Sequence, residues 1–179
     1  IENCKRGSIK DVFEYVFTKE AKALGKNALF IKENRVFNFS PYLLAAFPNC
    51  KFVYMVRDVR DFALSWKKSP NHPGAMKKAA SVWKEDQNEF KKLYSYLIDL
   101  NKIVLVKYED LVSDSETELK RICDLLNVEY SSKMLDFHKD DLRRKNAEKI
   151  KDWGNLAKPV MSSNFKKYLK ELTPAEIKY

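Results

Sequence analysis

The stretch Lys51–Ser65, KFVYMVRDVRDFALS, constrains the fold more than any other part of the chain. Residues 52–56 are an unbroken run of apolar, β-branched and aromatic side chains, which is typical of a strand buried on both faces of a parallel sheet. Charged residues follow at once, and apolar residues then recur at helical spacing, with Asp58 as the predicted N-cap. The stretch therefore predicts a strand, a tight charged turn and a helix.

Arg57 comes directly after this predicted strand. In open α/β sheets ligands bind at the carboxyl ends of the strands, because the helices that follow point their N-terminal N–H groups there. Arg57 and a helix N-terminus together predict an anion site. The alternative is a solvated turn with local ion pairs, since charged turns are common.

Strands and helices alternate along the rest of the chain. Short apolar runs predict further strands at 28–31 and 103–106. Helices are expected at 8–24, 40–47, 75–100 and 115–127, the first with an apolar stripe that should pack on a sheet and the last with a capping box made by Ser115 and Glu118. We therefore predict an α/β fold, a parallel β-sheet flanked by helices, in a single domain of residues 1–179.

The net charge of the 179 residues is +9, with a pI near 9.3, which favours an anionic partner. A nucleotide, an acidic glycan, nucleic acid and a membrane surface all fit this charge. The excess is mostly lysine spread along predicted helices, and no aromatic platform accompanies it, so specific nucleic-acid binding is only the minor alternative.

Cysteine and histidine residues suggest no metal or redox site. The three cysteines, Cys4, Cys50 and Cys123, are far apart and not in C-x-x-C spacing, and His72 and His138 lack partners at ligand spacing. Burial is the expected state of Cys123. No membrane span or signal peptide is visible, so we expect a cytoplasmic protein unless a signal or anchor precedes Ile1.

The stretch Lys51–Ser65 resembles the 3′-phosphate-binding element of sulfotransferases that use 3′-phosphoadenosine 5′-phosphosulfate (PAPS). In that family a strand leads into R-D-P-R-D and a helix with a serine, and here the residues read R-D-V-R-D-F-A-L-S. The resemblance implies a P-loop NTPase-like sulfotransferase fold in which Arg57 and Ser65 hold the 3′-phosphate. Val59 replaces the usual proline, which changes the stiffness of the turn and not the ligand chemistry.

Two later segments strengthen the resemblance. VLVKYEDL is similar to the family's strand that ends in Y-E-D-L, which implies that Tyr108 lies near the adenosine; alternatively, Tyr108 packs at the sheet edge and makes a hydroxyl hydrogen bond. Glu109 is expected to be structural. NLAKPVMSSNFKKYLKELTPAEI resembles a C-terminal element that folds over the nucleotide, which implies that Lys158 is a phosphate ligand.

The resemblance also suggests catalytic residues. Lys32 resembles the lysine of the family's K-T-H segment, which reaches the transferring group; alternatively, it pairs with a carboxylate. The acceptor hydroxyl needs a general base, and Asn34, which stands where the histidine is found, cannot accept a proton. Glu33 is the nearest carboxylate, although the base could also lie outside this chain.

One element of the family pattern is missing. A glycine-containing turn that binds the 5′-phosphosulfate normally precedes these elements, and residues 1–31 contain none, since CKRGS at 4–8 matches it poorly. We therefore expect a domain truncated at its N-terminus and near its C-terminus, which alone binds 3′-phosphoadenosine 5′-phosphate (PAP) weakly and transfers no sulfate. Its uncovered sheet edge would favour a homo-oligomer.

The resemblance implies transfer of a sulfuryl group from PAPS to a hydroxyl or amine acceptor, with PAP as product and without a metal. A P-loop kinase would need G-x-x-x-x-G-K-[ST], which is absent. A degenerate nucleotide-binding or interaction domain without turnover is the remaining alternative. The residues do not identify the acceptor.

Overall fold

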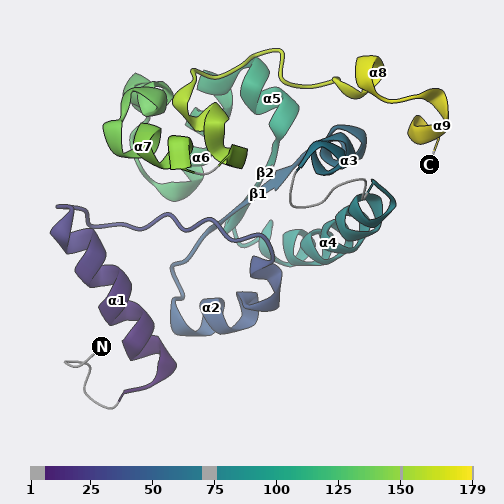
Figure 1. The fold of residues 1–179 in the computed structure, drawn as a ribbon. Coiled ribbons are helices and arrows are strands. Elements are labelled where there is room, and N and C mark those ends of the chain that lie inside the picture. Colours follow the sequence, from purple (N-terminus) through teal and green to yellow (C-terminus); the bar gives the residue numbers. More distant parts are fainter. Residues whose placement is uncertain (1–6, 70–75, 150, 179) are drawn as a thin grey trace. The chain divides into compact units, whose positions relative to one another are not determined.

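The computed structural model describes residues 7–69, 76–149 and 151–178, which fall into two compact units, Ile1–Cys50 and Lys51–Tyr179 (Figure 1). Helices and a parallel sheet make the fold α/β, as predicted. The single domain stays a prediction. Cys4, His72 and most of the loop before Met76 lie outside the described residues. Within them no helix is long and apolar enough to span a membrane.

The first unit contains helix α1 (Ile9–Ala23), the 3-10 helix η1 (Val36–Asn38) and helix α2 (Ser40–Ala46). A reciprocal cap begins α1 where the sequence predicts it. The N–H of Ser8 donates to Asp11 Oδ2 at 2.7 Å, and the N–H of Asp11 donates to Ser8 Oγ at 3.3 Å. Gly25 follows the helix with φ +64°, a conformation that glycine adopts without strain.

The predicted strand at 28–31 does not form. Residues 28–31 have no ladder partner, and the side chain of Phe30 is 70% exposed. A run of four residues has too few side-chain contacts to hold an extended conformation unless a neighbouring strand pairs with its backbone. The prediction that Lys32 lies at the exit of a strand is therefore also wrong.

The apolar stripe of α1 does not pack on a sheet within its unit, because the described residues of that unit contain no strand. Instead, the ring of Phe13 contacts those of Phe17 and Phe47, with centroid distances of 4.3 and 5.5 Å. Several other stripe residues are exposed, among them Ile9, Val12 and Val16.

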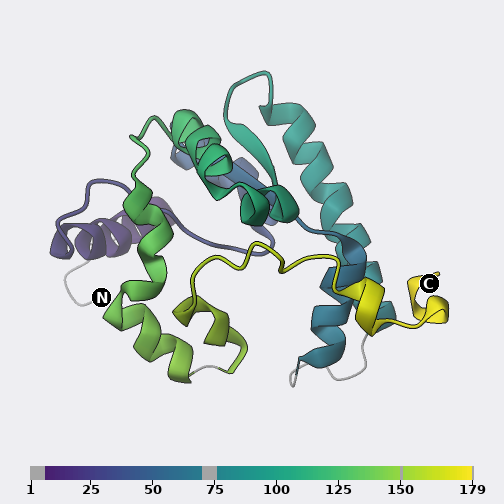
Figure 2. The same ribbon diagram turned by 90° about the horizontal axis from the view of Figure 1, so that it is seen from above.

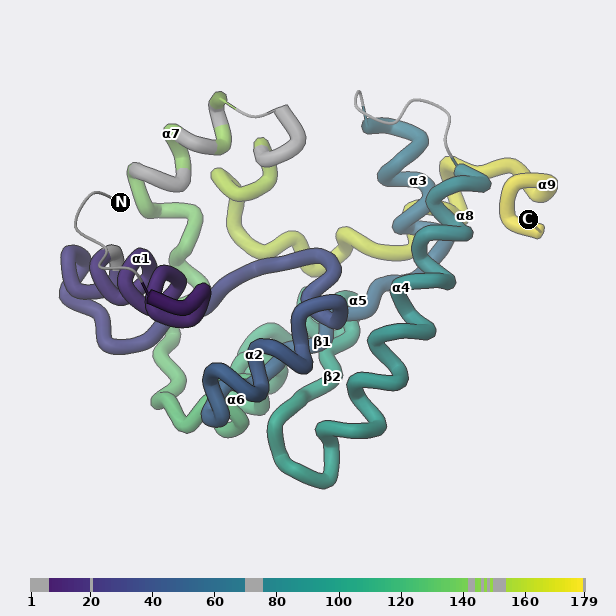
Figure 3. Tube along the Cα trace, turned by 90° about the horizontal axis from the view of Figure 1, so that it is seen from below, coloured from purple at the N-terminus to yellow at the C-terminus, as the bar shows by residue number. Residues whose placement is uncertain are grey.

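The second unit is built on strands β1 (Phe52–Val56) and β2 (Ile103–Lys107), which pair in parallel with Phe52 opposite Ile103. Between them run helices α3 (Val59–Lys68) and α4 (Met76–Leu97), and after β2 come α5 (Tyr108–Ser113) and α6 (Ser115–Leu126). Helix α4 covers one side of the sheet and α6 lies on the other (Figures 1 and 3). Except for the short helix α5, which was not predicted, this order of elements matches the sequence prediction.

Strand β1 is covered less completely than its composition predicts. Tyr54 is buried: its ring stacks on Phe90 at 4.7 Å, and its hydroxyl donates to Gln87. Met55, which points to the opposite face, is 49% exposed. The reason is that α6 packs mainly against β2 and leaves the second face of β1 partly open.

The cap of α6 differs from the prediction. Asp114 accepts the N–H of Thr117 at 3.2 Å, whereas the Ser115 hydroxyl donates to the carbonyl of Leu111 at 2.7 Å and Glu118 pairs with Arg121 at 2.6 Å. The capping box of Ser115 and Glu118 is therefore wrong. Helix α5 ends at Ser113, so Asp114 is the residue with the non-helical backbone that an N-cap needs.

The C-terminal part consists of short helices: η2 (Ser132–Lys139), α7 (Asp141–Lys149), η3 (Lys151–Ala157), α8 (Tyr168–Glu171) and α9 (Pro174–Ile177). Figure 2 shows the chain leaving η3 and returning to α3. There Leu64, Tyr168 and Leu172 form a buried apolar cluster. Residues more than a hundred positions apart thus share one core.

Helix α9 provides a test by pH. Hydrogen bonds from Lys67, at 2.6 Å, and from the Thr173 N–H, at 2.9 Å, lower the pKa of Glu176 from 4.5 to about 2. A pKa lower in the folded than in the unfolded chain contributes stability above pH 4.5 that is lost as the pH falls towards 2. We expect urea unfolding at pH 6 to show wild type more stable than Glu176→Gln, and the difference to shrink at pH 3. A difference that is constant with pH would contradict the assignment.

Candidate functional site

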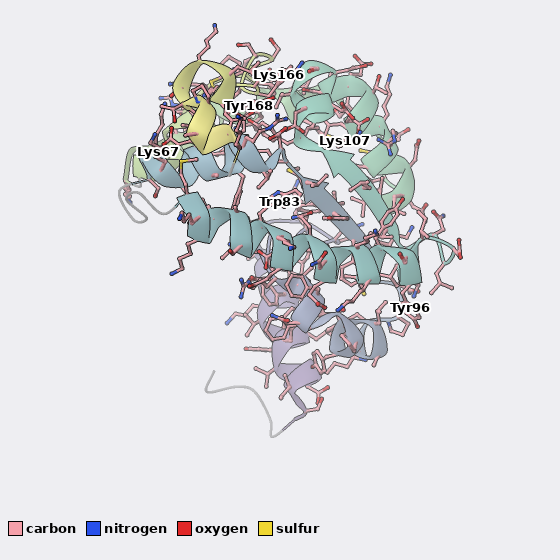
Figure 4. All side chains as sticks on the ribbon, turned by 90° about the vertical axis from the view of Figure 1, so that its right-hand side faces the viewer. Lys67, Trp83, Tyr96, Lys107, Lys166 and Tyr168 are labelled. Carbon is pink, nitrogen blue, oxygen red and sulfur yellow. The ribbon has the colours of Figure 1, made fainter. Side chains whose placement is uncertain are left out.

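The carboxyl ends of β1 and β2 bring Arg57 and Tyr108 together. Val56 pairs with Lys107 at the ends of the two strands, so the residues that follow them, Arg57 and Tyr108, lie side by side. The Arg57 Cζ is 4.5 Å from the centroid of the Tyr108 ring. Glu109 joins the two strand exits, because its Oε1 accepts the N–H of Asp58 at 2.9 Å. On the other side Trp83 of α4 donates its indole N–H to the carbonyl of Arg57 at 2.9 Å (Figure 4).

A pocket of about 400 Å³ opens beside this edge. It contains both Arg57 and Ser65, which come from the strand exit and from the second turn of α3. Its walls are formed by α3 and by the C-terminal segment, with Arg57, Asp61, Leu64, Ser65, Trp66, Lys68, Ser69, Asn155, Asn164 and Lys167 as lining residues.

The pocket carries more positive than negative charge. Arg57, Lys68 and Lys167 line it, and Lys68 also pairs with Glu171. The one lining carboxylate, Asp61, is 2% exposed and accepts the N–H groups of Lys166 and Tyr168 at 2.5 and 3.1 Å. Its charge is therefore met by backbone donors, and the pocket favours an anion.

The side chain of Arg57 has a hydrogen-bond donor, Nε, that no acceptor satisfies in the described part of the chain. Its Nη2 donates to the Asn164 carbonyl at 3.4 Å, whereas its Nε is buried and has no hydrogen-bond partner among the described residues. A buried donor without an acceptor is costly, and a phosphate or sulfate oxygen would satisfy it.

The N-terminus of α3 does not contribute to this site as predicted. The carboxylate of Asp58 accepts the N–H of Arg60 at 2.8 Å and binds its guanidinium at 2.5 Å, and these hydrogen bonds lower the pKa of Asp58. Because the protein's own carboxylate caps the helix, α3 lines the pocket with side chains further along the helix and not with its first N–H groups.

A family model described as the sulfotransferase family matches residues 2–132, which is most of the chain. The chain belongs to the sulfotransferase family. A search of curated proteins finds no match. The matched range contains Arg57, Ser65 and Tyr108, and three pocket residues, Asn155, Asn164 and Lys167, lie beyond it.

Tyr108 of this sulfotransferase makes the contacts that our structural alternative expects. Its ring packs against the Arg57 guanidinium, and its hydroxyl accepts the Nδ2–H of Asn164 at 2.6 Å. Glu109 is structural, as expected, since it joins the two strand exits. A contact of Tyr108 with adenosine stays a prediction.

Lys158 is exposed and is not among the residues that line the pocket, although its N–H donates to the carbonyl of the lining residue Asn155 at 3.1 Å. Lys167 is the C-terminal lysine that lines it. No sequence signal separates these two lysines, because their positions depend on the path of the chain after α7. A phosphate contact of Lys158 remains a prediction.

The predicted catalytic residues lie in the Ile1–Cys50 unit. Lys32 is exposed. Glu33 is also exposed, and its Oε1 accepts the N–H groups of Asn34 and Arg35 at 2.8 and 3.3 Å, which is the geometry of a local turn. Their catalytic roles stay predictions. Among the described residues no group of His, Cys, Asp and Glu could hold a metal ion.

Proposed function

We propose that this sulfotransferase uses PAPS as donor and that Arg57 and Ser65 bind the 3′-phosphate of the nucleotide. The observation that carries the proposal is the buried, unpartnered Nε of Arg57 in a pocket that Ser65 also lines. The acceptor would be a hydroxyl or amine.

The pocket residues suit a phosphate. A guanidinium is always charged and presents several donors in a plane, which matches phosphate oxygens, and a serine hydroxyl adds a donor on another side. Lys68 and Lys167 lie on the pocket wall, where their ammonium groups would balance a second phosphate charge. Apolar lining is limited to parts of residues such as Leu64 and Trp66.

The remaining roles follow from the chemistry of transfer. PAPS, when bound, supplies an activated sulfuryl group with PAP as the leaving group. In the proposal Lys32 provides positive charge for the transferring group and Glu33 accepts the proton of the acceptor. Lys158 and Tyr108 contribute further contacts with the nucleotide. Cytoplasmic location and self-association are proposed only on the sequence.

Ser65→Ala tests the 3′-phosphate site by calorimetry with PAP and with AMP, which lacks the 3′-phosphate. We expect wild type to bind PAP more tightly than AMP. The substitution should weaken PAP binding about fivefold, which corresponds to one hydrogen bond of about 1 kcal/mol, and should leave AMP binding unchanged. Ser95→Ala, at an exposed serine of α4, is the matched control. Equal affinity of wild type for PAP and AMP would contradict the proposed site.

Transfer of labelled sulfate from PAPS to a panel of alcohols and amines tests turnover. Product formation that is lost when Lys32 or Glu33 is replaced supports the proposed sulfuryl transfer and the roles of these two residues. Preference for PAP over AMP without any product, both in this chain and in one extended upstream by a strand–loop–helix unit, would instead indicate the nucleotide-binding domain without turnover that the sequence leaves as an alternative.

A further inference from the structure

Asn164 holds two of the proposed nucleotide-binding residues at once. Its backbone carbonyl accepts Arg57 Nη2 at 3.4 Å, and its side-chain Nδ2 donates to the Tyr108 hydroxyl at 2.6 Å. It is half-buried, lines the pocket and lies outside the range that the family model matches. Asn164 therefore connects the C-terminal segment to the exits of both strands.

These contacts restrict the guanidinium of Arg57 on two sides. The Tyr108 ring lies against its plane at 4.5 Å, and the Asn164 carbonyl holds Nη2. The buried Nε has no partner in the described part of the chain. An arginine side chain has several rotatable bonds, and ordering it before the ligand arrives reduces the entropy lost on binding.

The position of Asn164 is itself fixed from both sides. Its own N–H donates to the carbonyl of Met161 at 2.9 Å. Two residues later the Lys166 N–H bonds to the buried carboxylate of Asp61 at 2.5 Å, with Lys166 at φ +57°. Figure 4 shows Lys166 and Tyr168 together near α3. The segment therefore presents Asn164 to Arg57 from a defined place.

We propose that Asn164 is a positioning residue that orients the Arg57 guanidinium, directly and through Tyr108, so that its Nε faces the 3′-phosphate. The inference rests on the proposed function, in which Arg57 binds that phosphate. Asn164 thereby sets the preference for nucleotides with a 3′-phosphate over those without one. Its side-chain Oδ1 is buried and has no partner among the described residues, so the side-chain amide is bonded there through Nδ2 to Tyr108.

The test compares PAP with AMP in the 179-residue chain by calorimetry. Asn164→Ala keeps the backbone carbonyl that accepts Arg57 Nη2 and removes only the side-chain bond to Tyr108. We therefore expect it to lower the ratio of PAP to AMP affinity about threefold, the value of one neutral hydrogen bond, and to leave AMP affinity unchanged. In the Arg57→Ala background the same substitution should have no further effect, because Asn164 acts through Arg57. Tyr108→Phe, which removes only the hydroxyl, should lower the ratio about threefold.

Asn88→Ala, at an exposed asparagine of α4, is the matched control, and urea unfolding shows whether each variant remains folded. Equal weakening of PAP and AMP in Asn164→Ala would overturn the inference, because it indicates a loosened segment and not a misplaced arginine. An additive effect in the Arg57→Ala background would overturn it as well. Failure of the proposed function is seen separately, as a wild-type chain that does not prefer PAP over AMP.

Discussion

Replacing Arg57 with alanine should weaken PAP binding by about 10- to 100-fold while AMP binding changes little. Hydrogen bonds to a charged group contribute about 1.5–3 kcal/mol, and each 1.4 kcal/mol corresponds to a factor of ten in affinity. The substitution removes the buried Nε and the Nη2 that Asn164 holds. Calorimetry with both nucleotides measures the effect.

Arg57→Lys separates charge from geometry. A lysine keeps the positive charge but lacks the planar fork and the Nε donor, so we expect it to restore only part of the affinity. Arg144, in α7, has a side chain that is 54% exposed and is not among the residues that line the pocket. Arg144→Ala removes the same charge elsewhere and should have little effect on PAP affinity. If Arg57→Ala binds PAP as tightly as Arg144→Ala does, Arg57 does not bind the phosphate.

The sequence predicts those parts of the fold that depend on neighbouring residues. The segment from β1 to α3 is predicted correctly because its apolar run, its charged turn and its cap all lie within residues 52–61, and Asp58 caps α3 as expected. The start of α1, predicted at residue 8, is correct for the same reason, since Ser8 and Asp11 bond each other's backbone N–H groups. In each case the hydrogen-bond partners are within three residues of one another.

The errors occur where a partner comes from elsewhere or where neighbours compete. The run 28–31 has the composition of a strand, but a strand needs a second one at its edge. At the start of α6, Asp114 and Ser115 are both good caps, and the end of α5 at Ser113 decides in favour of Asp114. Aspartate and serine have similar preferences for the N-cap position, so the sequence around α6 does not show which of the two residues caps it.

The candidate site follows the same division. Arg57 and Ser65 are eight residues apart on one strand–turn–helix unit, and the structure brings both into the pocket. Asn164 and Lys167 arrive from a segment about a hundred residues later, and no spacing in the sequence relates them to Arg57. A tertiary contact brings them together, because the backbone near them bonds to the buried carboxylate of Asp61. In the sequence, Asp61 looks like any other charged residue of a solvated turn.

Asp61→Asn should destabilise the fold by about 2–4 kcal/mol, because two hydrogen bonds to a buried carboxylate contribute about 1.5–3 kcal/mol each, partly offset by hydration of the carboxylate in the unfolded chain. The amide keeps the shape of the side chain but turns an N–H₂ towards one of the two backbone donors, those of Lys166 and Tyr168. No cavity forms, so the loss reports on hydrogen bonding. Urea unfolding gives the free energy.

The same substitution should also loosen the C-terminal segment from α3, since Asp61 holds the backbone of Tyr168, whose side chain packs in the cluster with Leu64 and Leu172. Limited proteolysis should then cut between Asn164 and Glu171 faster than in wild type, and PAP affinity should fall because Asn164 and Lys167 leave the pocket wall. Asp124→Asn, at an exposed aspartate of α6, is the control. Unchanged stability of Asp61→Asn would mean that the apolar cluster alone holds the segment and that the buried carboxylate is dispensable.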